Sequence, residues 1–310
     1  MIKKIGIGVL AFVITTGTGI GTFFKTDLFE TYRDLWVQTA MTTSNHKYLA
    51  TLFLSDEEIE EIMSKYVVEN DSNSTSGLVN LSNESDNVEI TEIEGDTYTG
   101  YVIEVSNPSR VSLVDIRDDE NGTLMSEYVE EEGDILAAIN AGGFSFSKRG
   151  SYDGSLNSMT IIDQELVYGD EETSESLIGL SSEGELILGD FTYSEAIEAG
   201  IEDAISFGPF LIVDGEDQIE EEATGGLQPR TTIGQRADGT IILVTIEGRS
   251  KTSLGATLYD MQEIMKEYGA INAANLDGGG SSEMIYEGSI INDLSNGDER
   301  TMPTAFIVSE

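Results

Sequence analysis

The chain has 310 residues, enough for one large domain or two small ones. Hydrophobic residues make up 39% of it and charged residues 24%, so most of the chain can fold around a core. The charge is unbalanced: 58 Asp and Glu residues face 16 Lys and Arg, for a net charge of −42. A surface this acidic repels phosphate backbones, which excludes nucleic acid as a partner.

The scarcity of two residue types narrows the chemistry further. The chain has no cysteine, which excludes disulfides, thiolate metal sites and a cysteine nucleophile. Its one histidine, His46, lies in a polar turn, where we expect a surface or helix-contact role. Sites built from several histidines are therefore excluded, which leaves carboxylates, arginines, hydroxyls and backbone amides to act.

The N-terminal segment reads as a membrane anchor. Residues 5–24 carry no charge, and a helix of this length spans about 30 Å, the thickness of a bilayer core. Lys3 and Lys4 before it predict a cytoplasmic tip at residues 1–4 and the rest of the chain outside the cytoplasm. We therefore expect a single-pass cell-membrane protein, with a cleaved signal peptide as the alternative.

Two further segments precede the main domain. Residues 25–68 are predicted to form a helical stalk, in which Ser55 and Glu58 read as a capping box before an apolar helix face. Residues 69–87 are rich in Asn, Ser and Asp, which predicts a flexible linker. The folded domain is expected to cover residues 88–310.

Within 88–310, short β-branched runs alternate with turn residues, while helical patterns are few. The fold class predicted from this pattern is α+β, with a mixed, mostly antiparallel sheet core and a few packed helices. Strands are expected at 101–105, 111–116, 135–139, 159–162, 186–188, 210–213, 241–246, 284–286 and 305–308. Helices are expected at 124–131, 194–199 and 253–268.

Polar residues follow several predicted strands. Asn140 precedes two glycines and offers both a donor and an acceptor, although a plain tight turn would also explain it. Arg230 begins one strand, and Glu247 and Arg249 flank a glycine at the end of another. In so acidic a chain these arginines could hold an anion, with surface ion pairs as the alternative.

The segment from Asp277 to Ser282 is the most unusual in the chain. It places Gly278, Gly279 and Gly280 before Ser281 and Ser282, which is costly in backbone entropy unless the loop must approach something closely. Consecutive glycine amides can form a nest for phosphate oxygens. No Lys-Ser or Lys-Thr follows, as a P-loop requires, and the next element reads as a strand rather than the helix of a dinucleotide fold.

Taken together and in chain order, INAGGF, SFGPFLIVDG, QPRTTIG, a strand ending in EGR, NLDGGGSS and ERTMPTAFIV resemble the phosphodiester glycosidase family over residues 95–310. The resemblance implies hydrolysis of the bond between an anomeric carbon and a phosphodiester oxygen. It places Asn140, Arg230, Asp277, the loop 278–281 and Arg300 around the site. Glu247 and Arg249 match the family pattern less closely.

Our hypothesis is that Arg230, helped by Arg249 or Arg300 and the glycine amides, holds the phosphate, while Asp277 or Glu247 assists water. The partner would be a sugar-1-phosphodiester or a phosphate-containing surface glycan. We expect no required cofactor, with Ca²⁺ or Mg²⁺ possible and no metal ligands assigned. Three alternatives stay open: a non-catalytic module binding anionic glycopolymers, a metal-dependent phosphodiesterase attacking phosphorus, and a structural envelope protein.

Overall fold

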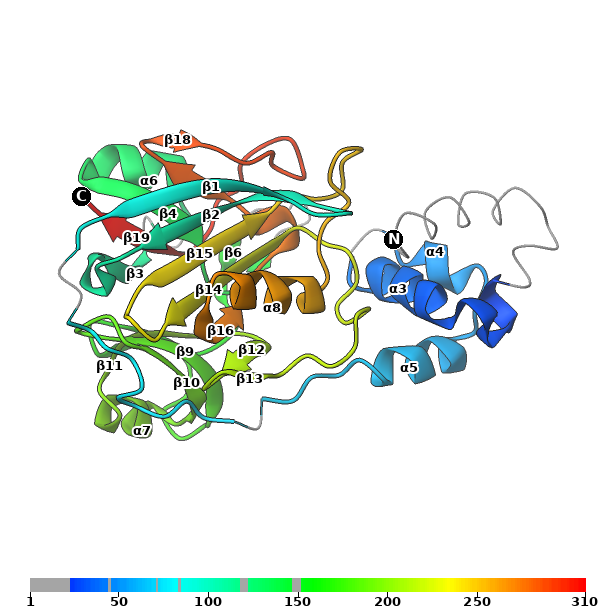
Figure 1. Ribbon diagram of the computed structural model, residues 1–310, viewed down its shortest axis with the longest axis horizontal. Helices are drawn as coiled ribbons and strands as arrows, with labels where there is room; N and C mark the ends of the chain where they lie inside the picture. Colours follow the sequence, from blue (N-terminus) through cyan, green and yellow to red (C-terminus); the bar gives the residue numbers. More distant parts are fainter. Residues whose placement is uncertain (1–22, 44–45, 71, 83–84, 118–121, 147–151) are drawn as a thin grey trace.

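The computed structural model describes residues 23–43, 46–70, 72–82, 85–117, 122–146 and 152–310. These residues form a large β-rich unit and a small unit of helices beside it (Figure 1). The helical unit lies at the blue end of the chain, and the remaining elements belong to the β-rich unit.

Three sheets and a hairpin build the β-rich unit, and every strand pair among the described residues is antiparallel. The first sheet has the order β1 (Val88–Glu94), β2 (Thr99–Val105), β15 (Ile241–Ile246), β14 (Arg230–Arg236), β16 (Ala270–Asn275), β12 (Phe210–Val213), β13 (Glu216–Asp217). The second is β10 (Leu186–Phe191), β9 (Glu175–Ser181), β11 (Ile201–Ser206), β7 (Thr160–Ile162), β8 (Glu165–Tyr168). The third is β18 (Ser289–Ile290), β17 (Met284–Tyr286), β4 (Ile135–Asn140), β19 (Thr304–Ser309), β3 (Val111–Asp115), and the hairpin pairs β5 (Phe144–Phe146) with β6 (Tyr152–Leu156).

One central core joins the three large sheets. Alternate residues of β2, β4, β9, β15 and β19 turn inward, because successive side chains of a strand point to opposite faces. Ile139, Leu243 and Phe306 are examples from three of these strands, and all are buried there. The predicted α+β fold built on antiparallel sheet is confirmed.

Each sheet carries one helix on its outer face. Helix α8 (Leu258–Glu267) packs on the first sheet, α7 (Tyr193–Glu198) on the second and α6 (Met125–Glu132) on the third. Helix α8 is shorter than predicted, because Thr257 and Asp260 form a capping box that begins it there. Leu254 falls within the predicted helix 253–268, but it precedes the observed helix and is exposed.

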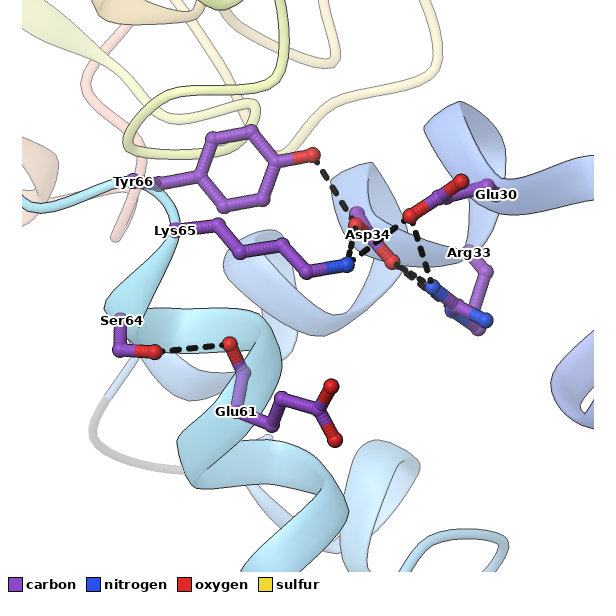
Figure 2. A network of polar contacts seen from close by, with 7 residues as sticks. All are labelled: Glu30, Arg33, Asp34, Glu61, Ser64, Lys65 and Tyr66. Atoms are coloured by element: carbon purple, nitrogen blue, oxygen red, sulfur yellow. Dashed lines mark hydrogen bonds and ion pairs between the residues drawn. The ribbon is translucent and has the colours of Figure 1, made fainter. Parts of the chain in front are cut away.

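The helical unit consists of η1 (Asp27–Phe29), α3 (Glu30–Met41), α4 (Tyr48–Thr51) and α5 (Asp56–Ser64). The predicted capping box of Ser55 and Glu58 begins α5. A buried carboxylate, Asp34, ties α3 to the end of α5, as Figure 2 shows: it lies 2.7 Å from the Arg33 guanidinium and accepts a 3.0 Å bond from the Tyr66 hydroxyl. The helical unit thus has its own hydrophobic core and its own buried polar network around Asp34.

The predicted membrane span lies almost wholly outside the described residues. Of residues 5–24, only Phe23 and Phe24 are described, and both are buried against the helical unit. Among the helices that the structure describes, none combines the length and apolarity needed to cross a bilayer.

Residues 69–87 differ from the flexible linker that we expected. Ser74 N donates to the Leu188 carbonyl, Thr75 N to the Asp214 carboxylate and Asn80 N to the Ala237 carbonyl. The described part of this segment therefore lies along the β-rich unit. The side chains of Asn73 and Ser74, which suggested solvation, instead accept from Asp190 N and Leu188 N of β10.

Candidate functional site

The site forms where the first and third sheets meet. Leu276 N donates to the carbonyl of Thr231 in β14, and the next residue, Asp277, donates through its backbone N to the Ala141 carbonyl just after β4. Asp277 therefore bridges two sheets through its backbone. The predicted glycine loop begins at this junction, with Gly279–Ser281 forming the short helix η3.

Motifs far apart in the sequence converge around this junction. Gly142 N donates to the Thr304 hydroxyl at 3.0 Å. A Cβ atom on Gly143 would lie 2.7 Å from the Phe207 ring, and Asn275 Nδ2 donates to the Gly208 carbonyl. The INAGGF, SFGPF, NLDGGG and TMPT segments, which carry the family resemblance, thus occupy one region.

Asn140 holds the junction together. Its Nδ2 donates to the Asp277 carbonyl at 2.6 Å, and its Oδ1 accepts from the Thr231 hydroxyl at 2.7 Å and from Glu283 N at 3.1 Å. Only 1% of the residue is exposed. Asn140 therefore fixes the position of Asp277 by bonding its backbone carbonyl.

Asp277 is the carboxylate at the centre of the site. Burial raises its pKa to about 6, while bonds from the Ser281 side chain and Gly278 N and the nearby Arg300 charge oppose that rise. The residue keeps some solvent access. Such a group exchanges its proton close to neutral pH, as acid–base chemistry requires.

The glycine loop does not present a row of free amides. Gly278 N serves the Asp277 carboxylate, Gly279 N donates to the Pro229 carbonyl and Ser281 N to the Gly278 carbonyl. The expected phosphate nest is therefore not the function of Gly278 and Gly279. Their absent side chains matter instead.

Two glycines make room for two guanidinium groups. A Cβ atom at Gly279, whose φ is +65°, would lie 2.9 Å from Arg249 Nη2. A Cβ atom at Gly280 would lie 2.2 Å from Arg300 Nη2. Any larger residue would displace the arginines, so the two glycines allow both guanidinium groups to approach the loop that follows Asp277.

Arg249 has the features of an anion-binding residue. Its Nε and Nη2 donate to Gln228 Oε1 at 3.3 and 2.9 Å, and no described carboxylate forms an ion pair with it. By contrast, Arg33, Arg117 and Arg236 each pair with an acidic residue. Desolvation and then repulsion from Arg300 lower the pKa of Arg249, which places the two cations near each other.

Arg249 also has a left-handed backbone, with φ of +60°. For a residue with a side chain this conformation costs about 1–2 kcal/mol. Strain of this kind persists where the surrounding structure fixes it, and it is concentrated at functional positions.

Arg230 is placed differently from our expectation. Its Nε donates to the Ala256 carbonyl, and its Nη2 donates to the Gly225 and Gly226 carbonyls at 2.7 and 3.1 Å. Burial, followed by repulsion from Arg249, lowers its pKa to about 10. Arg230 thus lies close to the site, but its side chain fastens the neighbouring loops.

Glu247 is likewise occupied. Its Oε2 accepts from the Thr99 hydroxyl at 2.8 Å, and its Oε1 accepts from Asp293 N at 2.8 Å. The carboxylate therefore joins β2 to the loop that leads toward Arg300. Ser281 accepts from Arg300 Nη1, while the hydroxyl of the buried Ser282 has no described partner.

Sequence reasoning missed two residues of the site. Glu283 directly follows the glycine loop and is 2% exposed, and burial followed by repulsion from Glu299 raises its pKa to about 9. Gln228 is the second, because its Oε1 accepts hydrogen bonds from the Arg249 guanidinium. The acidic residue between Ser282 and an apolar strand was a signal for the first, whereas only the fold reveals the second.

No metal site can be assigned from the described residues. Within them, no three His, Asp or Glu side chains are grouped so that they could share a cation.

The chain is similar to known proteins in sequence. The family described as phosphodiester glycosidase matches residues 133–309, more than half of the chain. The SPbeta prophage-derived protein YomE of Bacillus subtilis is 39% identical over 117 residues, 36% of this chain and 18% of that protein. The mouse N-acetylglucosamine-1-phosphodiester alpha-N-acetylglucosaminidase is 23% identical over 223 residues, 65% of this chain and 42% of that enzyme.

The fold is also similar to a solved structure. The catalytic domain of the zebrafish N-acetylglucosamine-1-phosphodiester alpha-N-acetylglucosaminidase superposes with a TM-score of 0.61 at 24% identity, covering 75% of this chain and 86% of that one. The present chain spans less than half the length of the mouse and Bacillus relatives.

Proposed function

Because the chain belongs to the phosphodiester glycosidase family, we propose that it hydrolyses the bond between a sugar's anomeric carbon and the oxygen of a phosphodiester. The observation that carries this proposal is the neighbourhood of Asp277, whose pKa lies near 6, with Arg300 beside it and Arg249 beside Arg300. One carboxylate next to two cations suits a substrate whose leaving group is an anion.

The cations explain why a histidine is unnecessary. An ordinary glycosidase protonates an alkoxide leaving group with a carboxylic acid. A phosphate monoester leaves more readily, and guanidinium groups stabilise its charge without transferring a proton. We assign the phosphate to Arg249 and Arg300, in place of the central role first given to Arg230.

Asp277 then acts as a carboxylate on the sugar side. It either takes a proton from the attacking water or stabilises positive charge at the anomeric carbon. Asn140 and Ser281 hold it in place, the first through the backbone and the second through the side chain.

The test is to incubate the full chain with sugar-1-phosphodiesters and measure reducing sugar and phosphate monoester. Oxygen-18 water separates the two possible hydrolases, since label in the sugar means C–O cleavage and label in the phosphate means attack at phosphorus. The proposal requires label in the sugar. Activity that persists with chelator supports the view that no divalent cation is required.

The proposal extends to the substrate and to the cellular location. We propose a phosphate-containing glycan as the substrate, since the mammalian relatives are named for a sugar-1-phosphodiester. Membrane attachment through residues 5–24, with the enzyme outside the cytoplasm, stays a prediction that fractionation of cells and protease accessibility would check.

A further inference from the structure

A cavity of about 670 Å³ lies between the helical unit and the β-rich unit. Tyr32, Leu35 and Trp36 of α3 line one side, and Leu227 and Leu254 line the other. Pockets for small organic ligands have volumes of about 300–1,000 Å³ and mostly apolar walls. The volume and the mostly apolar lining of this cavity match those of such pockets.

The two units are fastened to each other beside the cavity. Leu227 N donates to the Thr39 hydroxyl at 2.9 Å. Gln228 Nε2 donates to the Thr39 carbonyl and to the Thr42 hydroxyl, each at 3.0 Å. A Cβ atom at Gly226 would meet the Thr39 backbone at 2.4 Å, so the units are in close contact. Helix α3 is thus held against the β-rich unit, and the cavity between them has two fixed walls.

Arg249 connects this cavity to the site. The residue lines the cavity, and its Nη2 lies 2.9 Å from where a Gly279 Cβ would be. Gln228, which accepts from that guanidinium, also lines the cavity. One cation therefore has the Asp277 loop on one side and an apolar chamber on the other.

We propose that the cavity binds an apolar aglycone of the substrate, an alkyl or isoprenoid chain, while Arg249 holds the phosphate. This inference rests on the proposed function. A phosphodiester carries two substituents, and the sugar must reach Asp277, on the Arg300 side of Arg249. The second substituent then leaves the phosphate toward Leu227 and Leu254.

The chemistry of the walls selects an apolar chain. Polar residues such as Ser250 and Asp260 also line the cavity, but most of its surface is apolar. Hydroxyl groups of a sugar or polyol would lose water against leucines such as Leu35 and Leu227 without gaining partners there. A methylene chain instead gains about fourfold in affinity for each group fully buried. This role also explains Leu254, which is 45% exposed at the cavity although a leucine gains nothing from solvent.

Trp36 provides a readout that does not depend on catalysis. It is the only tryptophan of the chain and lines the cavity, so its fluorescence reports on an occupant. We expect ethyl, butyl and octyl phosphate, below the concentrations at which they form micelles, to change this emission saturably. The affinity should rise about two- to fourfold per methylene. Octanol, which lacks the phosphate, should bind more weakly than octyl phosphate.

A matched pair of variants locates the binding. Leu254→Ser should weaken octyl phosphate binding about three- to tenfold, because half of a leucine's apolar surface is removed from the wall. Leu78→Ser is the control, since Leu78 is 49% exposed and does not line the cavity. Equal affinity for ethyl and octyl phosphate, or no response of Trp36, would overturn the proposal. Either result is expected if another part of the chain occupies the cavity.

Kinetics then separate this inference from the function on which it rests. Sugar-1-phosphodiesters with methyl and octyl aglycones should both be hydrolysed, with kcat/KM at least tenfold higher for the octyl compound. Equal kcat/KM would refute the aglycone site and leave the enzyme assignment intact. No sugar release from either compound, while octyl phosphate still binds, would refute the proposed function and with it the role of the cavity.

Discussion

Replacing Glu283 with Gln should make the protein more stable at neutral pH. Glu283 is 2% exposed, its carboxyl bonds to Glu299, and its Oε1 has no partner among the described residues. Burial, and then repulsion from Glu299, raises the pKa of Glu283 to about 9, from 4.5 for a free side chain. The folded chain therefore keeps a proton that the unfolded chain releases at neutral pH.

The sign and size of the effect follow from that difference in proton binding. Below pH 4.5 both states are protonated, so the group has no pH-dependent cost. As pH rises from 4.5 toward 9, only the unfolded state loses the proton, and stability falls by at most about 1.4 kcal/mol per pH unit. Between pH 5 and 8 this amounts to an upper limit of about 4 kcal/mol from this one residue.

The measurement is urea unfolding of wild type and Glu283→Gln at pH values from 5 to 8. The variant keeps the shape and a donor for Glu299 but cannot ionise, so its advantage over wild type should grow with pH. Glu131→Gln is the control, because Glu131 is exposed at the end of the neighbouring helix α6. If all three proteins lose stability in parallel, Glu283 is not held protonated and the reasoning fails.

Three further predictions concern the site. Asp277→Asn should lower kcat about 10²–10³-fold, and wild-type kcat/KM should rise as pH passes about 6, where the carboxylate ionises; a profile that falls there would make Asp277 the acid. Gly279→Ala should raise KM and Gly288→Ala should not, because only the first methyl would meet Arg249. Both glycines have left-handed φ angles, so the two variants should melt at similarly lowered temperatures, and equal KM values would contradict the prediction. Arg230→Gln should cost about 1–3 kcal/mol in urea unfolding, since three donations to carbonyls are lost, while raising KM less than Arg249→Gln does; the reverse order of KM effects would restore Arg230 as the phosphate ligand.

The sequence sufficed for much of the fold because local patterns determine it. Short β-branched runs bounded by turn residues predict β15 and β19, and the apolar spacing of Met261, Ile264 and Met265 predicts α8. The start of α8 was missed, since Ser253 and Leu254 continue a helical pattern that the Thr257 cap interrupts. The pairing of strands was not predictable, because β2 pairs with β15 and β14 with β16 across long stretches of chain.

The site was predictable in composition but not in the role of each residue. The family resemblance implied that Asp277 and Arg300 lie together, and in the structure Arg300 is near Asp277 and Arg249 is near Arg300. What a sequence cannot show is which donors are already used. In the sequence, Arg230 and Arg249 both read as cations at strand ends. In the structure, the Arg230 guanidinium donates to backbone carbonyls, whereas the Arg249 guanidinium donates to the side-chain oxygen of Gln228.

The acidity of the chain makes it informative that Arg249 has no ion-pair partner among the described residues. With 58 carboxylate residues against 16 basic ones, an arginine at random on this surface would readily find an acidic neighbour, as Arg236 finds Glu104. Arg249 is instead kept from such partners by a left-handed backbone and by Gln228, a neutral acceptor that orients a cation without neutralising it. An anionic ligand would then gain the whole charge interaction, whereas a guanidinium already paired with Glu would first have to lose its partner. On this argument Gln228→Glu should weaken alkyl phosphate binding more than Gln228→Ala does, because the first supplies a competing carboxylate and the second removes only an orienting bond. Weaker binding by the alanine variant would show that orientation, rather than an uncompensated charge, gives Arg249 its function.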